Sequence, residues 1–261
     1  MNLYNAVLAN DVGEVAMLLK NNPSIDVNWM KCYQDGITRS CLQLACTLGH
    51  RKIILLLLAH PGIDVNAEDD IEKTALGRAC YHYNKSCVEL LLKDPRVDTL
   101  KGRSRMTPFF WLVESHQLEC IKYWIASGRK FELRGKGDNA QECISYAKKT
   151  GFFDLALLLE NFTVNPIQKR DEIRKEIGWY DERAAEIFAR VIFLSDGLLE
   201  IRTNSEEKTT RFFNITRQLP MELQMIICSR AAGSMKNNIK SEDSERAFRY
   251  LALFFVVKYR N

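Results

Sequence analysis

The chain has 261 residues, of which 46% are hydrophobic and 27% are charged, and its formal net charge is +4. These values are ordinary for a globular protein, and the length accommodates one elongated domain and one small one. Because basic and acidic residues are nearly balanced, the charge gives no indication of a nucleic-acid-binding protein. The longest late apolar run, residues 250–257, is far too short to cross a bilayer as a helix.

The N-terminal residues and the cysteines both bear on the cellular compartment. The chain starts directly in a helix-like segment and lacks the basic stretch, apolar core and cleavage site of a signal peptide. Its eight cysteines include no Cys-x-x-Cys pair, so we expect reduced thiols that fill a core, with no metal and no cofactor. We therefore expect a cytoplasmic protein; the nucleus or the cytosol of a host cell is also compatible with the sequence.

A pattern recurs about every 33 to 35 residues through the first two thirds of the chain. Each copy has a helix-like motif, a two-residue spacer and a second apolar run, and several end in a Pro-x-x-Asp tail. The motifs start at Ser40, Thr74, Thr107 and Glu142. A degenerate first copy would hold helices at 3–9 and 14–20 and would end in the tail 23–28.

Each copy predicts two short amphipathic helices and a turn, because its apolar residues are spaced three and four apart. Such a pair is too small to enclose a core, so the copies must stack and share one apolar seam. In the last copy, Phe152 and Phe153 are expected to be covered by the chain that follows. Trp111, inside the motif that starts at Thr107, is expected to lie in the core.

These copies resemble the ankyrin-repeat family, whose pattern is Thr-Pro-Leu-His-x-Ala, then Gly-His, then Leu-Leu-Leu and a Gly-Ala-Asp-Val-Asn-like tail. The resemblance covers residues 1–163 and implies an all-α solenoid of about five helix pairs. Only Thr107-Pro108 keeps the Thr-Pro pair, and no copy keeps the histidine of that motif. The hydrogen bonds that this histidine usually makes between neighbouring loops must therefore come from other groups or be missing.

Residues 167–261 predict a small C-terminal domain of four or five helices. We expect a charged helix at 168–177 that ends at Gly178, a long amphipathic helix at 181–202, and a loop at 203–208. An apolar segment at 211–218 follows, then a helix that begins at Pro220 and ends near Gly233. A final helix runs from Ser241 to Tyr259.

The segment 219–227 looks like the opening of an F-box, the helical module that docks on a cullin–RING ubiquitin-ligase adaptor. It matches the pattern Leu-Pro-x-Glu-Leu-x-x-x-Ile, but the aspartate–leucine and the tryptophan expected further along are absent. A leucine–proline helix start is also a common structural device. The ligase hypothesis predicts that Leu219, Met221 and Leu223 are exposed, and the alternative of a plain packed helix predicts that they are buried.

No constellation of residues predicts catalysis. The sequence holds no nucleophile elbow, phosphate-binding glycine loop or His-Glu-x-x-His motif. His116 and Cys120 lie about one helical turn apart, but no third polar partner is evident. An unrecognised enzyme in the C-terminal domain remains a lesser alternative.

The resemblance instead implies a protein-binding module that uses its loop tips and concave face. Two groups of residues on expected loop tips and inner helices are candidates, one basic and one aromatic. The basic group would bind an acidic or phosphorylated segment and comprises Lys101, Arg103, Arg105, Arg134 and Lys136. The aromatic group would supply rigid anchors for a partner and comprises Trp29, Tyr33, Tyr81 and His82. We expect a non-enzymatic adaptor or scaffold that binds a protein partner and not a membrane; the alternative is the substrate receptor of a cullin–RING ligase.

Overall fold

The computed structural model describes residues 2–102, 106–132, 140–199 and 207–258. The chain divides into two compact units. Unit 1 comprises residues up to Ile173 together with the end of the chain from Val256, and unit 2 comprises 174–255. The division falls inside one helix, α11 (Pro166–Glu176). The sequence placed the domain junction slightly earlier, between 163 and 167, and that boundary stays a prediction.

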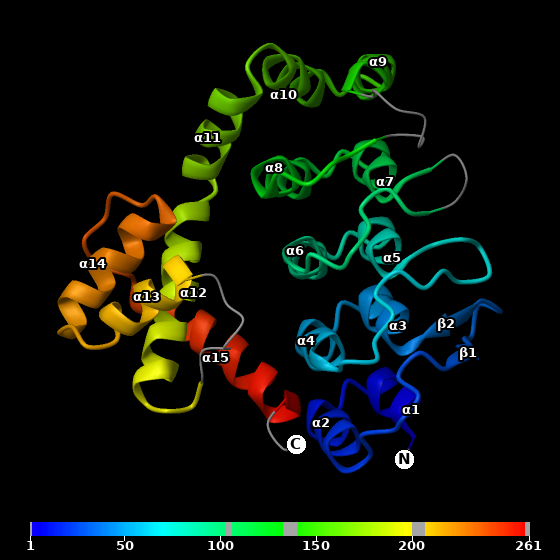
Figure 1. The fold of residues 1–261 in the computed structure, drawn as a ribbon. Helices are drawn as coiled ribbons and strands as arrows, with labels where there is room; N and C mark the ends of the chain where they lie inside the picture. Colours follow the sequence, from blue (N-terminus) through cyan, green and yellow to red (C-terminus); the bar gives the residue numbers. More distant parts are fainter. Residues whose placement is uncertain (1, 103–105, 133–139, 200–206, 259–261) are drawn as a thin grey trace. The chain divides into compact units, whose positions relative to one another are not determined.

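Unit 1 is a stack of five helix pairs, as the repeat predicted. Figure 1 shows the first helix of each pair in one row and the second helix in a parallel row. We call the first row the inner helices. The inner helices are α1 (Leu3–Leu8), α3 (Cys41–Leu48), α5 (Ala75–Tyr81), α7 (Pro108–Glu114) and α9 (Ala140–Lys149). The second row holds α2 (Val12–Asn21), α4 (Arg51–Ala59), α6 (Lys85–Lys93), α8 (Leu118–Ser127) and α10 (Phe153–Val164).

The motif residues start the inner helices through side-chain caps. Ser40 caps α3 with a full capping box, in which its hydroxyl accepts from the Gln43 amide and the Gln43 side chain accepts from the Ser40 amide. Thr74 caps α5 by accepting from the amide of Gly77. In α7, Pro108 occupies the first helical position, where the absence of an amide hydrogen costs nothing.

The turn between the two helices of each pair has a left-handed backbone. The residue at this position is Asn10, Gly49, Tyr83, His116 and Gly151 in successive pairs, with φ between 54° and 83°. Glycine adopts this conformation freely and asparagine tolerates it, whereas a side chain such as that of tyrosine is strained there. The strain falls on the third and fourth pairs.

The seam between the helix rows is mainly apolar. In α4, six consecutive residues from Ile53 to Leu58 are buried, because this helix lies between its own inner helix and the second helices on either side. Seven of the eight cysteines are also buried, as expected, and all eight are free thiols. Burial raises the pKa of Cys41 and of Cys143 to about 12, so these thiols stay protonated.

Asparagines in the tails connect successive repeats. The Asn28 side chain donates to the carbonyl of Gly62 (2.7 Å) and accepts from the amide of Asp64 (2.8 Å). Asn66 repeats this pattern on the next tail, donating to Arg96 and accepting from Asp98. Each amide side chain thereby satisfies a backbone donor and acceptor that would otherwise be unpaired between stacked loops.

The loop after α2 carries a short hairpin, which the sequence analysis treated only as a loop tip. Strand β1 (Met30–Cys32) pairs antiparallel with β2 (Thr38–Ser40). The turn between them includes Gly36, whose φ of 79° is a conformation that favours glycine.

Unit 2 is helical and centres on α12 (Trp179–Ser195), which packs mainly on α14 (Met221–Ala232). The other helices are α13 (Glu207–Thr216) and α15 (Ser241–Lys258). Two apolar clusters join them, one around Ala185, Ala189 and Ala247 and one around Phe188, Val191 and Cys228. Pro220 precedes α14 and Gly233 ends it in the left-handed conformation, as the sequence predicted.

Three structural expectations were wrong. The long helix of unit 2 ends at Ser195 and not at Arg202, because Asp196 caps it and Gly197 turns left-handed at φ 70°. Phe153 is 70% exposed rather than covered, since α10 directs it away from the repeat core. Trp111 is half-buried on the surface of α7 rather than enclosed in the core.

The left-handed turns yield a stability prediction. Replacing Tyr83 by glycine should raise the free energy of unfolding by about 1 kcal/mol, because glycine removes the strain at φ 58° and the tyrosine side chain is already 53% exposed. Urea unfolding followed by circular dichroism measures the change.

The matched control is Gly49→Ala at the equivalent turn. It should lower stability by about 1 kcal/mol or more, because a left-handed alanine is strained and its Cβ would lie 3.0 Å from Oδ1 of Asn84. A loss of stability in Tyr83→Gly would show that the tyrosine turn is not strained.

Candidate partner-binding surface

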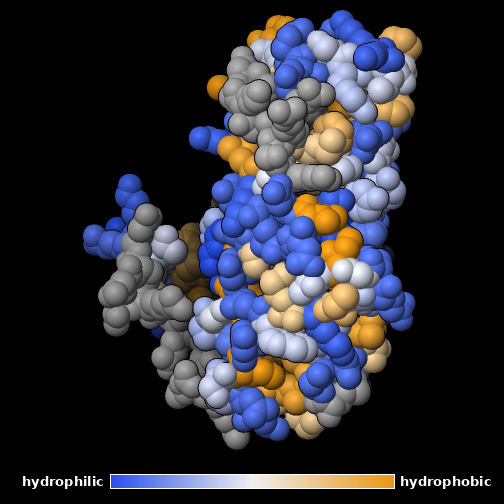
Figure 2. Space-filling model, turned by 90° about the vertical axis from the view of Figure 1, so that its right-hand side faces the viewer, coloured by the Kyte–Doolittle hydropathy of each residue, from blue (hydrophilic) through white to orange (hydrophobic). Residues whose placement is uncertain are grey.

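One side of unit 1 is formed by the loops that precede the inner helices and by the inner helices themselves. We call the part made by residues 29–48, 66–83, 99–102 and 106–115 the loop-side surface. It includes the β1–β2 hairpin, the loop 66–74 and helices α3, α5 and α7. Figure 2 views the molecule from the side on which these loops project, and it shows apolar residues scattered among hydrophilic ones.

Gln43 fixes the loop 66–74 from the neighbouring repeat. Its Nε2 donates to the carbonyl oxygens of Ala67 (2.8 Å) and Lys73 (3.1 Å), at the two ends of that loop. Gln43 occupies the motif position at which ankyrin repeats carry histidine, so the loop-to-loop bonds expected of that histidine come from the glutamine amide. The equivalent residue in the next repeat is Gly77, which has no side chain.

Threonines make the corresponding connections further along the stack. Thr99 Oγ1 donates to the carbonyl of Lys130 (2.9 Å), and Thr107 Oγ1 donates to the carbonyl of Glu132. The repeats therefore stay coupled through different polar side chains at different levels.

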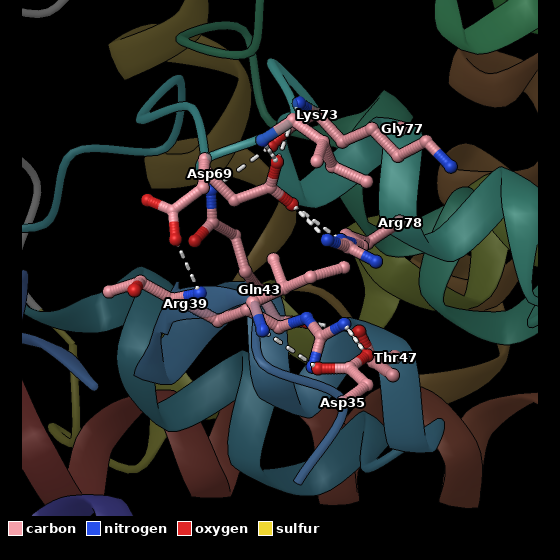
Figure 3. Close-up of polar contacts among 12 residues, drawn as sticks. Asp35, Arg39, Gln43, Thr47, Asp69, Lys73, Gly77 and Arg78 are labelled. Atoms are coloured by element: carbon pink, nitrogen blue, oxygen red, sulfur yellow. Dashed lines mark hydrogen bonds and ion pairs between the residues drawn. The ribbon is translucent and has the colours of Figure 1, made fainter. Parts of the chain in front are cut away.

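Asp69 holds the same loop through hydrogen bonds with its backbone amides. Its Oδ1 accepts from the amides of Ile71 and Lys73, both at 2.9 Å, and its Oδ2 accepts from Nε of Arg78 at 2.5 Å. Figure 3 shows this carboxylate directed at Arg78, which comes from α5. Both side chains of the pair are almost fully buried, and removing either would leave a buried charge without compensation. Burial lowers the pKa of Arg78, and the Asp69 carboxylate opposes that effect.

A second ion pair lies beside the first. The buried guanidinium of Arg39 binds both carboxylate oxygens of Asp35 and lies 5.1 Å from the centre of the Tyr33 ring. The hydrogen bond from Arg39 holds the pKa of Asp35 below its ordinary value. Arg39 is buried, but the Asp35 side chain is 46% exposed, so the carboxylate of this pair is accessible to solvent.

A buried lysine supports the aromatic residues of the surface. The ammonium of Lys73 lies 3.4 Å from the centre of the Tyr81 ring and 4.2 Å from that of Trp111. The two rings meet edge to face, with centroids 5.0 Å apart. Lys73 is only 6% exposed and Tyr81 is 41% exposed, so the cation lies beneath a ring that faces solvent. Contacts of this kind fix ring orientation and stabilise by about 1–2 kcal/mol when desolvated.

The predicted aromatic residues do not form one cluster. Tyr81 is exposed, and His82 beside it is half-buried; burial and then the nearby Arg78 lower the pKa of His82, which favours a neutral ring. Tyr33 is half-buried on Arg39, while Trp29 is 48% exposed and packs edge-on against Tyr4 of the first repeat. Tyr81 and His82 therefore lie together, and Trp29 belongs to another part of the stack.

The predicted basic group falls largely outside the described residues. Arg103, Arg105, Arg134 and Lys136 are all among the residues that the structure leaves undescribed. Lys101 is described; it is half-buried, and its ammonium lies 3.6 Å from the Glu68 carboxylate. Sequence reasoning missed the polar groups beneath the surface, Asp69, Lys73 and Arg78, because a pairing across nine residues that straddles a loop leaves no periodic signal.

The F-box-like segment of unit 2 is partly exposed. Met221 is 58% and Leu223 is 46% exposed, and Leu219 is half-buried. The buried residues of α14 are Gln224, Cys228 and Ser229, and the Gln224 side-chain amide donates to the carbonyl of Leu219 at 2.8 Å. An amide and a thiol thus occupy positions where a plain packed helix would bury leucines.

His116 and Cys120 lie in different environments. His116 Nε2 lies 2.7 Å from the Asp154 carboxylate, and the His116 ring stacks on Phe152. These two contacts join the fourth and fifth repeats. Burial raises the pKa of nearby Cys120 to about 11, so this thiol is not an activated nucleophile. Within the described residues, no group of three or more histidine, cysteine or acidic side chains is placed to hold a metal ion, and no helix is long and apolar enough to span a membrane.

Comparison with known proteins identifies the repeat. A family model described as "Ankyrin repeat" matches residues 38–67, which contain Ser40, Gln43 and the first part of loop 66–74. The chain is 30% identical over 137 residues to "SMC5-SMC6 complex localization factor protein 1" of both Bos taurus and Homo sapiens, an alignment that covers 51% of this chain and 13% of each relative. It is 34% identical over 128 residues to "E3 ubiquitin-protein ligase XBAT33" of Arabidopsis thaliana, covering 48% of this chain and 23% of that protein.

The chain thus aligns with less than a quarter of the length of these relatives. The matched segment and the five stacked helix pairs agree: residues 38–67 are an ankyrin repeat, and unit 1 has the all-α fold of an ankyrin-repeat solenoid.

Proposed function

We propose that the chain is a non-enzymatic adaptor whose ankyrin repeats hold a segment of a partner protein against the loop-side surface. The observation that carries this proposal is the arrangement of Tyr81, which is exposed to solvent yet held in place by Lys73 and Trp111. Aromatic side chains that are rigid before binding lose little entropy when a partner docks, and such residues dominate the energetics of many interfaces.

Two further observations support a binding role. Tyr83 keeps a large, exposed side chain at a strained left-handed turn where glycine would fit without cost. Strain of this kind persists where the side chain is needed for something other than folding. The relatives include a protein named as a localisation factor of a complex, which is in keeping with an adaptor. A cytoplasmic location, expected from the reduced cysteines, forms part of the same proposal.

Site-specific crosslinking tests this function. A photoreactive benzoylphenylalanine placed at Tyr81 should capture a discrete protein from extracts of the native cell. The same group at Phe153, which is 70% exposed on the fifth repeat, is the control. Truncation of Tyr81 to alanine should weaken binding of the captured protein by about tenfold or more, measured with the purified pair. If Phe153 captures the same protein as efficiently, or if Tyr81 captures nothing, the loop-side surface is not the binding site.

A second candidate function is favoured by the exposure of α14. In the ligase hypothesis, Met221 and Leu223 would insert into a cullin–RING adaptor, and both are exposed as that hypothesis requires. The relative named as an E3 ubiquitin-protein ligase accords with a role in ubiquitination, although it aligns over only 128 residues. In this function the repeats would hold the substrate and unit 2 would recruit the ligase.

The double variant Met221→Glu/Leu223→Glu separates this candidate from a simple adaptor. Because both side chains are exposed, the variant should fold with little change in circular dichroism. Wild type should recover a cullin adaptor in affinity purification, the double variant should lose it, and Met235→Glu, at a position that is 82% exposed in the same unit, should retain it. Absence of a cullin adaptor from the wild-type sample would rule out the ligase role.

A further inference from the structure

The charged side chains of the loop-side surface are sorted by sign. Three of its cations, Arg39, Lys73 and Arg78, are between 1% and 6% exposed. The other two described cations, Lys31 and Lys101, are half-buried. The exposed charged side chains on the described part of the surface are all carboxylates. They are Asp35, Glu68, Asp70, Glu72 and Glu114. On the described part of this surface, the charges most accessible to a partner are therefore negative.

The buried cations are already engaged within the fold. Arg39 binds Asp35, Arg78 binds Asp69, and the Lys73 ammonium lies on two aromatic rings. An anionic partner could reach these groups only by displacing a carboxylate or opening the aromatic pair. Either change would give up contacts that the fold already makes.

The exposed carboxylates lie next to the aromatic residues. Asp70 belongs to the same loop as Lys73, and its Oδ2 accepts from the amide of Thr38, which joins that loop to the hairpin of Asp35. Glu114 follows Trp111 by three residues on α7, so the two side chains share one face of the helix. Asp35 lies in the turn of the hairpin that the Asp70–Thr38 hydrogen bond joins to the loop, so its carboxylate belongs to the same part of the surface. Asp35, Asp70 and Glu114 thus lie on the hairpin, the loop and the helix that carry or adjoin the Tyr81–Trp111 pair.

We propose that the loop-side surface binds a lysine- and arginine-rich segment of a partner protein. The cationic ends would meet Asp35, Asp70 and Glu114, and the aliphatic stems of the same side chains would lie on Tyr81 and Trp111. Lysine and arginine suit such a surface because their apolar stems cover hydrophobic area while their charged ends stay in water. This inference rests on the proposed function and names the chemistry of its partner.

The competing partner is the acidic or phosphorylated segment that the sequence suggested. That hypothesis rests on Lys101, Arg103, Arg105, Arg134 and Lys136. Lys101 is paired with Glu68, and the other four lie outside the described residues. The two partners have opposite charge, so a matched pair of peptides distinguishes them.

Fluorescence anisotropy with the full chain provides the test. The probes are two fluorescein-labelled peptides of equal length, one of repeating Gly-Lys-Leu and one of repeating Gly-Glu-Leu. The lysine peptide should bind at least about tenfold more tightly than the glutamate peptide, and its affinity should fall as salt is raised, because exposed ion pairs are screened. The double variant Asp70→Asn/Glu114→Gln should lower the affinity for the lysine peptide by about fivefold to tenfold.

The control is the double variant Glu142→Gln/Glu222→Gln, which removes two exposed carboxylates from α9 and α14 and should leave binding unchanged. Equal affinity for the two peptides, tighter binding of the glutamate peptide, or an equal loss in the control variant would each overturn the inference. If crosslinking at Tyr81 captures a partner through an acidic segment, this inference fails while the adaptor function stands. If Tyr81 captures nothing, the adaptor function fails as well.

Discussion

The loop-side surface depends on the polar contacts that hold loop 66–74 between two repeats. A single helix pair cannot enclose a core, so each repeat relies on its neighbours for burial. The apolar seam supplies most of that burial, but it does not determine where the loops lie. Gln43 and Asp69 do so, because one binds the two ends of the loop from the previous repeat and the other binds its interior amides. Lys73 ends the same loop, and its position beneath Tyr81 and Trp111 follows from those bonds.

Helix α5 is held by several side-chain contacts, and the turn that follows it has a strained backbone. Asp69–Arg78 and Lys73–Tyr81 join the loop to this helix, while the next turn carries the strained Tyr83. A sequence under selection for stability alone would be expected to carry glycine there, as it does at Gly49 and Gly151. The chain instead places exposed tyrosines on either side of His82. In the proposed function, this combination links the fold of the third repeat to partner binding.

The sequence predicted the helix pairs well because their signal is periodic: apolar spacing, capping residues and left-handed glycines act within one or two turns. It also predicted that the hydrogen bonds of the motif histidine must come from other groups or be missing, and the structure shows that Gln43 supplies them in the second repeat. The polar groups beneath the surface could not be predicted, since Asp69–Arg78 and Lys73–Trp111 join residues whose separation follows no repeat. The exposure of Phe153 and Trp111 was missed for a related reason, because an aromatic residue in an apolar motif looks the same whether it faces the core or solvent.

Hydrogen–deuterium exchange on the Gln43→Leu variant tests most directly whether these contacts hold the surface together. Leucine has a similar volume but donates no hydrogen bond, so the amides of Ile71 and Lys73 should exchange faster while those of α4 stay protected. A matched Gln117→Leu variant, which alters a glutamine whose amide reaches only Ser115, should leave the loop unchanged. Unchanged exchange in loop 66–74 of Gln43→Leu would contradict the account, because the loop would then be positioned by the apolar seam alone.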